Sequence, residues 1–182
     1  HGDAIADHVE ASREGMRALW ISLGGLGLTA LAQAAVVAAS GSVALLSDTI
    51  HNVSDALTAI PLGVAFVLGR RGPTRRYTYG YGRAEDLAGV FVVGVIALSA
   101  AVAAWQAVER LVEPRAIHQA GLVAVAGLVG FVGNEVIAGY RIRVGRRIGS
   151  AALVADGLHA RTDGLTSLAV VGAALGSLAG WP

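Results

Sequence analysis

Long uncharged stretches make up most of the chain, and short segments that carry most of its charge separate them. The first stretch lies between Arg17 and Asp48 and contains 30 consecutive uncharged residues, more than the roughly 20 that one membrane-spanning helix needs. The small residues at 40–42 suit a tight turn, which divides this stretch into two spans. The pattern predicts five spans in all, over 18–39, 43–69, 85–108, 119–140 and 150–177. We therefore expect an all-α membrane protein, a helical bundle, with a transmembrane domain over 17–182 that follows a cytoplasmic N-terminal segment over 1–16.

The arginines are unevenly distributed around these spans. Eleven of the 14 basic residues lie before the first span, between the second and third, or between the fourth and fifth. The opposite side holds only Arg110 and Arg115. The positive-inside rule therefore predicts an integral protein of the cell membrane with a cytoplasmic N-terminus. Residues 70–83 combine five arginines with three tyrosines, and a cytoplasmic loop facing anionic lipid explains this segment better than a nucleic-acid patch does.

Composition narrows the class of protein further. Apolar residues reach 54% and charged residues only 15%, against about 25% charged in ordinary globular domains. With 14 basic and 13 acidic residues the net charge is +1, which gives no reason to expect a nucleic-acid partner. The absence of cysteine excludes disulfides, thiolate metal sites and cysteine nucleophiles.

An internal repeat links the second span to the fifth. Residues 41–60 read GSVALLSDTIHNVSDALTAI and residues 149–168 read GSAALVADGLHARTDGLTSL, with nine of the twenty positions identical. The second span would run from outside to inside and the fifth from inside to outside. Related segments in opposite directions are typical of the inverted repeats of secondary transporters. A repeat of three spans predicts a sixth span beyond Pro182, and so a truncated chain.

Each copy of the repeat contains the pattern Asp-x2-His-x3-Asp. The residues are Asp48, His51 and Asp55 in the first copy and Asp156, His159 and Asp163 in the second. Steps of three and four residues return to nearly the same face of a helix, so two facing helices would offer two imidazoles and two carboxylates. Such a set suits a tetrahedral divalent transition metal, zinc above all. Each histidine follows its turn by about nine residues, which is roughly 13 Å at 1.5 Å per residue and therefore close to the membrane midplane.

These motifs resemble those of a known family, the cation diffusion facilitators. The HNVSD of 51–55 and the HARTD of 159–163 are similar to the paired metal-binding motifs on the family's second and fifth membrane helices, and YTYGYGRAEDLAG at 77–89 resembles the stretch before its third helix. The resemblance covers nearly the whole chain. It implies six transmembrane helices, a homodimer, and export of divalent cations in exchange for protons. It also implies a transport site formed by His51, Asp55, His159 and Asp163.

The ligand set bears on which metal is carried. Among cation diffusion facilitators, the presence of histidine rather than aspartate at position 51 resembles the pattern of the zinc-preferring members. Imidazole suits zinc, whereas an all-oxygen site suits manganese. Zn²⁺ is therefore the expected transported substrate, with Co²⁺, Ni²⁺, Fe²⁺ and Cd²⁺ as open alternatives. Because histidine must be neutral and carboxylates ionised to coordinate, metal and protons compete for the site, which predicts metal export against proton import.

Other polar residues are expected to have supporting roles. Asp48 and Asp156 would either orient the ligand histidines from behind or form steps in an ion path. Arg161 points away from the face of His159 and is expected to pair with an acid such as Asp86 or Glu135. A further group, His1, Asp3, Asp7 and His8, is interpreted as a mobile polar terminus rather than a cluster that collects metal.

Two other classes of function compete with a transporter. A membrane-embedded di-metal oxidoreductase would explain the carboxylate-x2-His pairs, but bundles of the di-iron type use four carboxylates with glutamates, and the repeat would then have no explanation. An intramembrane metalloprotease would need HExxH, which the sequence lacks. A non-transporting metal sensor would keep the site and show no flux. We expect a transporter with no catalytic residues and no resident cofactor.

Overall fold

The computed structural model describes residues 2–40, 59–68, 83–112 and 119–180, and all the regular structure within these ranges is helical. The helices are α1 (Gly2–Ser40), a short helix (Ala59–Leu68), α3 (Arg83–Val112), α4 (Ala120–Ile148) and α5 (Ala151–Leu178). The expected all-α class is confirmed. Parts of α1 (Glu10–Ala35) and α3 (Arg83–Val102), and the whole of α4, are long and apolar enough to cross a membrane.

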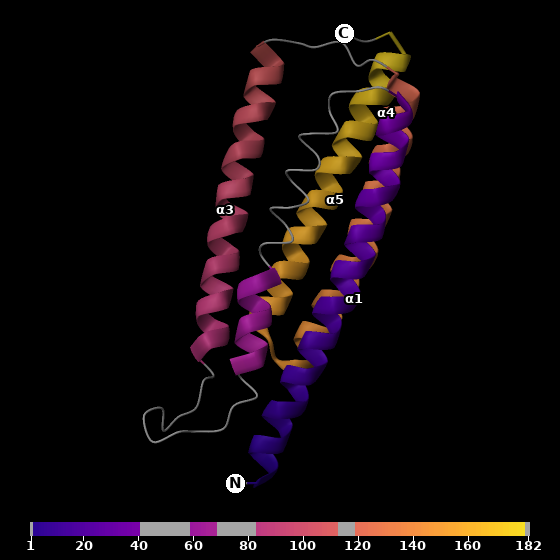
Figure 1. The fold of residues 1–182 in the computed structure, drawn as a ribbon. Helices are drawn as coiled ribbons and strands as arrows, with labels where there is room; N and C mark the ends of the chain where they lie inside the picture. Colours follow the sequence, from indigo (N-terminus) through magenta and orange to yellow (C-terminus); the bar gives the residue numbers. More distant parts are fainter. Residues whose placement is uncertain (1, 41–58, 69–82, 113–118, 181–182) are drawn as a thin grey trace.

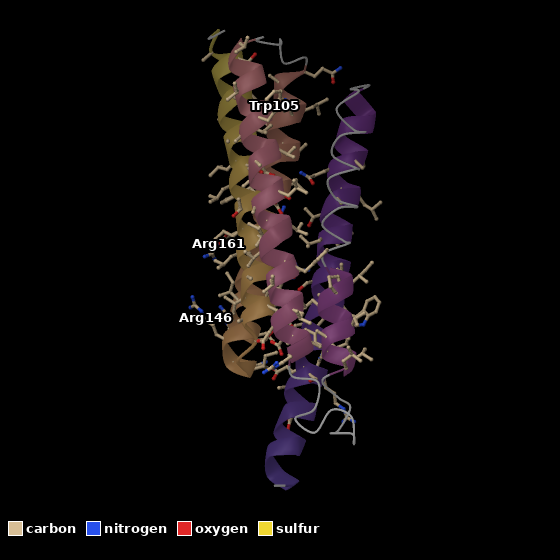
Figure 2. The ribbon with its side chains drawn as sticks, turned by 90° about the vertical axis from the view of Figure 1, so that its left-hand side faces the viewer. Trp105, Arg146 and Arg161 are labelled. Atoms are coloured by element: carbon tan, nitrogen blue, oxygen red, sulfur yellow. The ribbon has the colours of Figure 1, made fainter. Side chains whose placement is uncertain are left out.

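The helices stand side by side with their long axes roughly aligned (Figure 1). Helix α4 packs along α5, α1 packs against α4, and α3 contacts α5. Large apolar side chains cover much of the outside, among them Leu31, Val90 and Trp105, which are all at least 70% exposed. Trp105 is labelled on the outside of the bundle in Figure 2. An exterior of this kind suits contact with lipid chains rather than water.

A compact apolar cluster joins four of the helices near the turn between α4 and α5. Leu62 and Phe66 of the short helix pack with Leu19 of α1, Val144 of α4 and Leu153 of α5. Leu62 and Leu153 are completely buried. This cluster fixes the short helix against the bundle and holds the start of α5 in place.

A turn of two residues connects α4 to α5. Gly149 has a left-handed conformation with φ of 71°, which costs glycine no steric penalty. Ser150 caps α5, because its hydroxyl oxygen accepts a hydrogen bond of 3.2 Å from the backbone N–H of Leu153. The turn therefore makes α4 and α5 a tight antiparallel hairpin.

Two boundaries differ from the sequence prediction. Helix α1 begins at Gly2, so most of the segment expected to precede the first span is continuous with it. Helix α4 runs on past residue 140 to Ile148, and its last two turns contain arginines that the pattern placed between spans. Arginine is a good helix former, so the end of the apolar stretch does not end the helix.

Candidate metal centre

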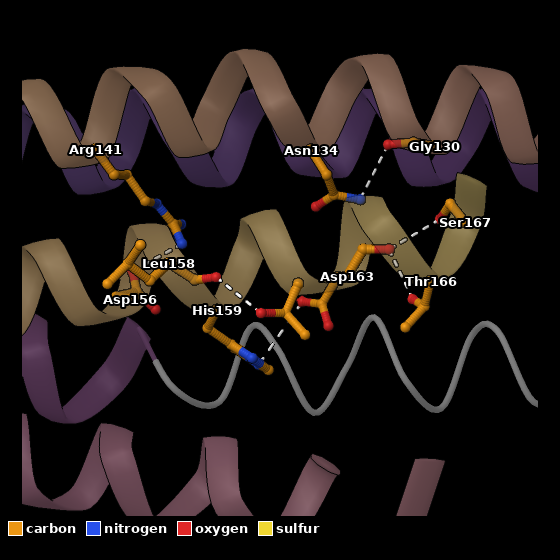
Figure 3. Close-up of polar contacts among 10 residues, drawn as sticks. Gly130, Asn134, Arg141, Asp156, Leu158, His159, Asp163, Thr166 and Ser167 are labelled. Carbon is orange, nitrogen blue, oxygen red and sulfur yellow. Dashed lines mark hydrogen bonds and ion pairs between the residues drawn. The ribbon is translucent and has the colours of Figure 1, made fainter. Parts of the chain in front are cut away.

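His159 and Asp163 lie one turn apart on the same face of α5. The distance between His159 Nε2 and Asp163 Oδ2 is 3.7 Å, and the side chains are only 4% and 13% exposed (Figure 3). The spacing of four residues explains the geometry, because such side chains lie one above the other on a helix. The pair therefore presents an imidazole nitrogen and a carboxylate oxygen together, away from the surface.

Hydroxyl groups next to this pair are bound to the helix itself. Thr166 Oγ1 donates a hydrogen bond of 2.7 Å to the carbonyl oxygen of Asp163, and Ser167 Oγ donates one of 3.1 Å to the same atom. Thr162 Oγ1 donates similarly to the carbonyl oxygen of Leu158. Such bonds satisfy hydroxyls without a partner helix, which leaves the imidazole and the carboxylate as the polar groups that define this face.

The other predicted ligands, His51 and Asp55, lie outside the described residues, as do Asp48 and His1. Within the described ranges, no three His, Cys, Asp or Glu side chains are grouped closely enough to hold a metal ion. The structure thus brings together the two ligands predicted on α5. The four-ligand site stays a prediction.

Asp156 pairs with an arginine of the neighbouring helix. Its Oδ2 lies 2.7 Å from Arg141 Nη1, and the side chains of Asp156 and Arg141 are 1% and 5% exposed. The sequence interpretation gave Asp156 a role behind the histidines or in an ion path, and assigned Arg141 to a polar segment between spans. The hairpin explains the contact, because the two residues are almost equally far from Gly149. Pairing residues at nearly equal distances on either side of the turn at Gly149 would have indicated this contact from the sequence.

Arg161 makes the contact expected of it. Its Nε and Nη2 donate hydrogen bonds of 3.1 and 2.6 Å to the two carboxylate oxygens of Glu135 on α4. Both side chains are about two-fifths exposed. The two-pronged geometry fixes the orientation of the guanidinium group, which is held away from His159 and Asp163.

Close backbone contact between α4 and α5 supports this arrangement. A Cβ atom added at Gly157 would lie 2.8 Å from Ile142 Cγ1 and 3.0 Å from Arg141 Cβ. A Cβ atom at Gly164, next to Asp163, would lie 3.2 Å from Asn134 Cβ. Glycine at these positions lets the helices approach closely, as small residues do in membrane bundles.

Residues 19–182 match the family model described as the cation efflux transmembrane domain. The chain belongs to the cation efflux family. This match confirms the resemblance to the cation diffusion facilitators, which rested on the paired His-x3-Asp motifs. Membership of this family supports a transporter rather than an enzyme.

Curated relatives of this cation efflux domain include proteins from bacteria and yeast. A probable cation efflux system protein of Mycobacterium tuberculosis is 61% identical over 180 residues, which are 99% of this chain and 54% of that protein. The vacuolar zinc transporter ZRC1 of Saccharomyces cerevisiae is 36% identical over 99 residues, 53% of this chain and 22% of that protein. The magnetosome protein MamB of Paramagnetospirillum magneticum is 27% identical over 143 residues, 79% and 48% of the two chains. The chain spans about half the length of its relative from M. tuberculosis.

Proposed function

We propose that the protein exports zinc from the cytoplasm across the cell membrane in exchange for protons. The observation that carries the proposal is the buried pair of His159 and Asp163 on one face of a long helix in a cation efflux domain. An imidazole and a carboxylate separated by one turn form half of a tetrahedral zinc site. His51 and Asp55 of the repeat complete the set in this proposal.

The ion pair of Arg141 and Asp156 gives the site a suitable charge. Because Arg141 neutralises Asp156, that carboxylate does not add its charge to the ligands one turn away. If Asp48 is not counted, the four proposed ligands, two carboxylates and two neutral imidazoles, then carry a charge of −2, which a divalent ion balances. A balanced site at membrane depth avoids the cost of an excess buried charge.

Zinc is the metal that the ligand types support best. Two nitrogen and two oxygen donors suit zinc in tetrahedral geometry. The similarity to the yeast protein named as a vacuolar zinc transporter supports the same choice. Co²⁺, Ni²⁺, Fe²⁺ and Cd²⁺ are the alternative cargoes to include in competition assays.

Proton exchange follows in this proposal from competition for the ligands. Because an imidazole must be neutral to bind a metal, His159 would take up a proton after the metal leaves and lose it before the next ion binds. The same proposal includes an N-terminus on the cytoplasmic side of the membrane and assembly of two copies of the chain into a homodimer. The arginines Arg143, Arg146 and Arg147, near the end of α4, support a cytoplasmic position for the α4–α5 turn.

Flux measurements on the full-length protein test the proposal. The protein would be reconstituted into vesicles that contain a zinc-sensitive dye and a pH-sensitive dye, with zinc added outside. We expect zinc accumulation coupled to proton movement in the opposite direction. Zinc flux without proton counterflow would overturn the exchange mechanism, whereas zinc binding without any flux would favour the metal sensor.

A further inference from the structure

A second charged site lies on the outer face of the α4–α5 hairpin. Gly139, Ile142, Arg143 and Arg146 of α4, with Arg161 of α5, line an open cavity of about 360 Å³, which we call the arginine groove. Arg146 and Arg161 both point outward from the same side of the bundle (Figure 2).

The groove carries excess positive charge. Glu135 accepts hydrogen bonds from Nε and Nη2 of Arg161, which leaves the two N–H groups of its Nη1 available. Arg143 and Arg146 are exposed, and among the side chains that the structure describes neither has an ion-pair partner. Three guanidinium groups against one carboxylate leave a charge of +2. Guanidinium groups bind phosphate through paired hydrogen bonds, so the chemistry points to a phosphate-bearing anion.

An apolar strip continues from the groove toward the opposite membrane surface. Val132 and Val136 precede Gly139 by seven and three residues on α4, and Leu165 and Leu168 follow Arg161 by four and seven on α5. These spacings place them on the same helix faces as the groove residues. All four side chains are between 41% and 64% exposed. A ligand with a charged head and long apolar tails would fit both parts.

We propose that the arginine groove binds the phosphate of an anionic phospholipid, whose acyl chains lie along the apolar strip. The groove includes residues from the last three turns of α4, and Arg143 and Arg146 lie in the two turns next to the α4–α5 turn, which the proposed orientation places on the cytoplasmic side. Basic pockets between membrane helices on the cytoplasmic side are suited to anionic headgroups. A second copy of the chain could also bind at the arginine groove in place of lipid. A two-fold contact would bring the same positive patch of each copy together, so lipid is the better occupant.

Lipid binding to the full-length protein tests the proposal. The double variant R143Q/R146Q removes two groove arginines, and R13Q/R17Q is the matched control, because it removes two exposed arginines of α1. Native mass spectrometry in detergent would compare phosphatidylglycerol with phosphatidylcholine. We expect wild type and the control to favour phosphatidylglycerol, and R143Q/R146Q to bind it roughly thirty-fold less tightly. An equal loss in both double variants, or no loss in either, would overturn the proposal.

A second variant tests the shape of the groove without changing its charge. A Cβ atom at Gly139 would meet nothing within 4 Å, and the same holds at Gly172 on α5. Gly139→Leu should therefore fold and block the groove, whereas Gly172→Leu is the control away from it. We expect weaker binding of phosphatidylglycerol only for Gly139→Leu. Unchanged binding would mean that charge alone attracts the lipid, and the groove would not be a site.

Two further measurements distinguish other occupants. Inorganic phosphate added to wild type is expected not to displace the bound phosphatidylglycerol, because it lacks acyl chains. Full displacement by phosphate would assign the groove to a soluble anion and overturn the lipid proposal. The same spectra report subunit number, and a dimer that dissociates in R143Q/R146Q while lipid binding persists would assign the face to subunit contact.

Discussion

Arg141 on α4 and Asp156 on α5 form an ion pair of 2.7 Å that is almost completely withdrawn from the surface. Breaking a buried pair leaves one charge without compensation, which costs about 3–5 kcal/mol. We therefore expect Arg141→Met or Asp156→Leu alone to lower the stability of the protein by about that amount. Thermal unfolding in detergent, followed by circular dichroism, would measure it.

The double variant R141M/D156L is the control for this pair. Replacement of both charges by apolar side chains is often neutral or stabilising, so the double variant should recover most of the stability lost in the single ones. If its loss equalled the sum of the two single losses, the ion pair would not be the reason for their effect.

Removal of a ligand on α5 should abolish transport. His159→Ala or Asp163→Ala would leave three of the four proposed ligands at a position shielded from water. We expect zinc flux near background with helicity unchanged. Thr162→Val is the matched control, since Thr162 is exposed and bonds to the backbone of its own helix. Ligand variants with the same flux as this control would contradict the site.

A milder effect is expected one turn from the proposed ligands. Asp48→Ala would remove a group that orients a ligand from behind, and such a loss costs about 10–100-fold. Flux of this variant would be compared with that of Asp163→Ala in the same vesicles. If Asp48→Ala proved the more damaging of the two, Asp48 rather than Asp163 would bind the metal directly.

Metal selectivity should depend on His51. The substitution His51→Asp would replace a nitrogen donor with a carboxylate, which can bind through one or both oxygens. Harder and larger ions such as manganese gain from this change while zinc loses an imidazole. We expect manganese transport to rise relative to zinc transport, and the zinc rate to fall, in competition assays on vesicles. An unchanged ratio in an active variant would show that His51 does not bind the metal.

Close packing at Gly157 should make alanine destabilising there. The added Cβ would lie 2.8 Å from Ile142 Cγ1 and 3.1 Å from the backbone nitrogen of Ile142. Overpacking of this kind typically costs about 1–3 kcal/mol. Gly176→Ala is the control on the same helix, because a Cβ there meets nothing within 4 Å and alanine favours helix over glycine by about 1 kcal/mol. Unfolding midpoints that moved in the same direction for both variants would contradict the packing argument.

The sequence predicted the faces of single helices better than the contacts between them. Spacing on α5 correctly separated Arg161 from His159 and Asp163, and the partner Glu135 was among the acids expected. The partner of Asp156 could not be predicted in this way, because it depends on how far α4 extends and how it is rotated against α5. Arg141 lies beyond the apolar stretch, so hydropathy alone placed it outside the helix that carries it.

The two-residue turn at Gly149 and Ser150 also limits how the domain can move. With so short a link and so close a contact at Gly157, α4 and α5 have little freedom to slide or separate. We expect the hairpin to move as one rigid body that carries His159 and Asp163. Its tilt against the rest of the bundle would then expose these two side chains to one side of the membrane or the other. Spin labels on α4 and α5 would then keep a constant separation in both transport states, while labels on α3 and α5 would not.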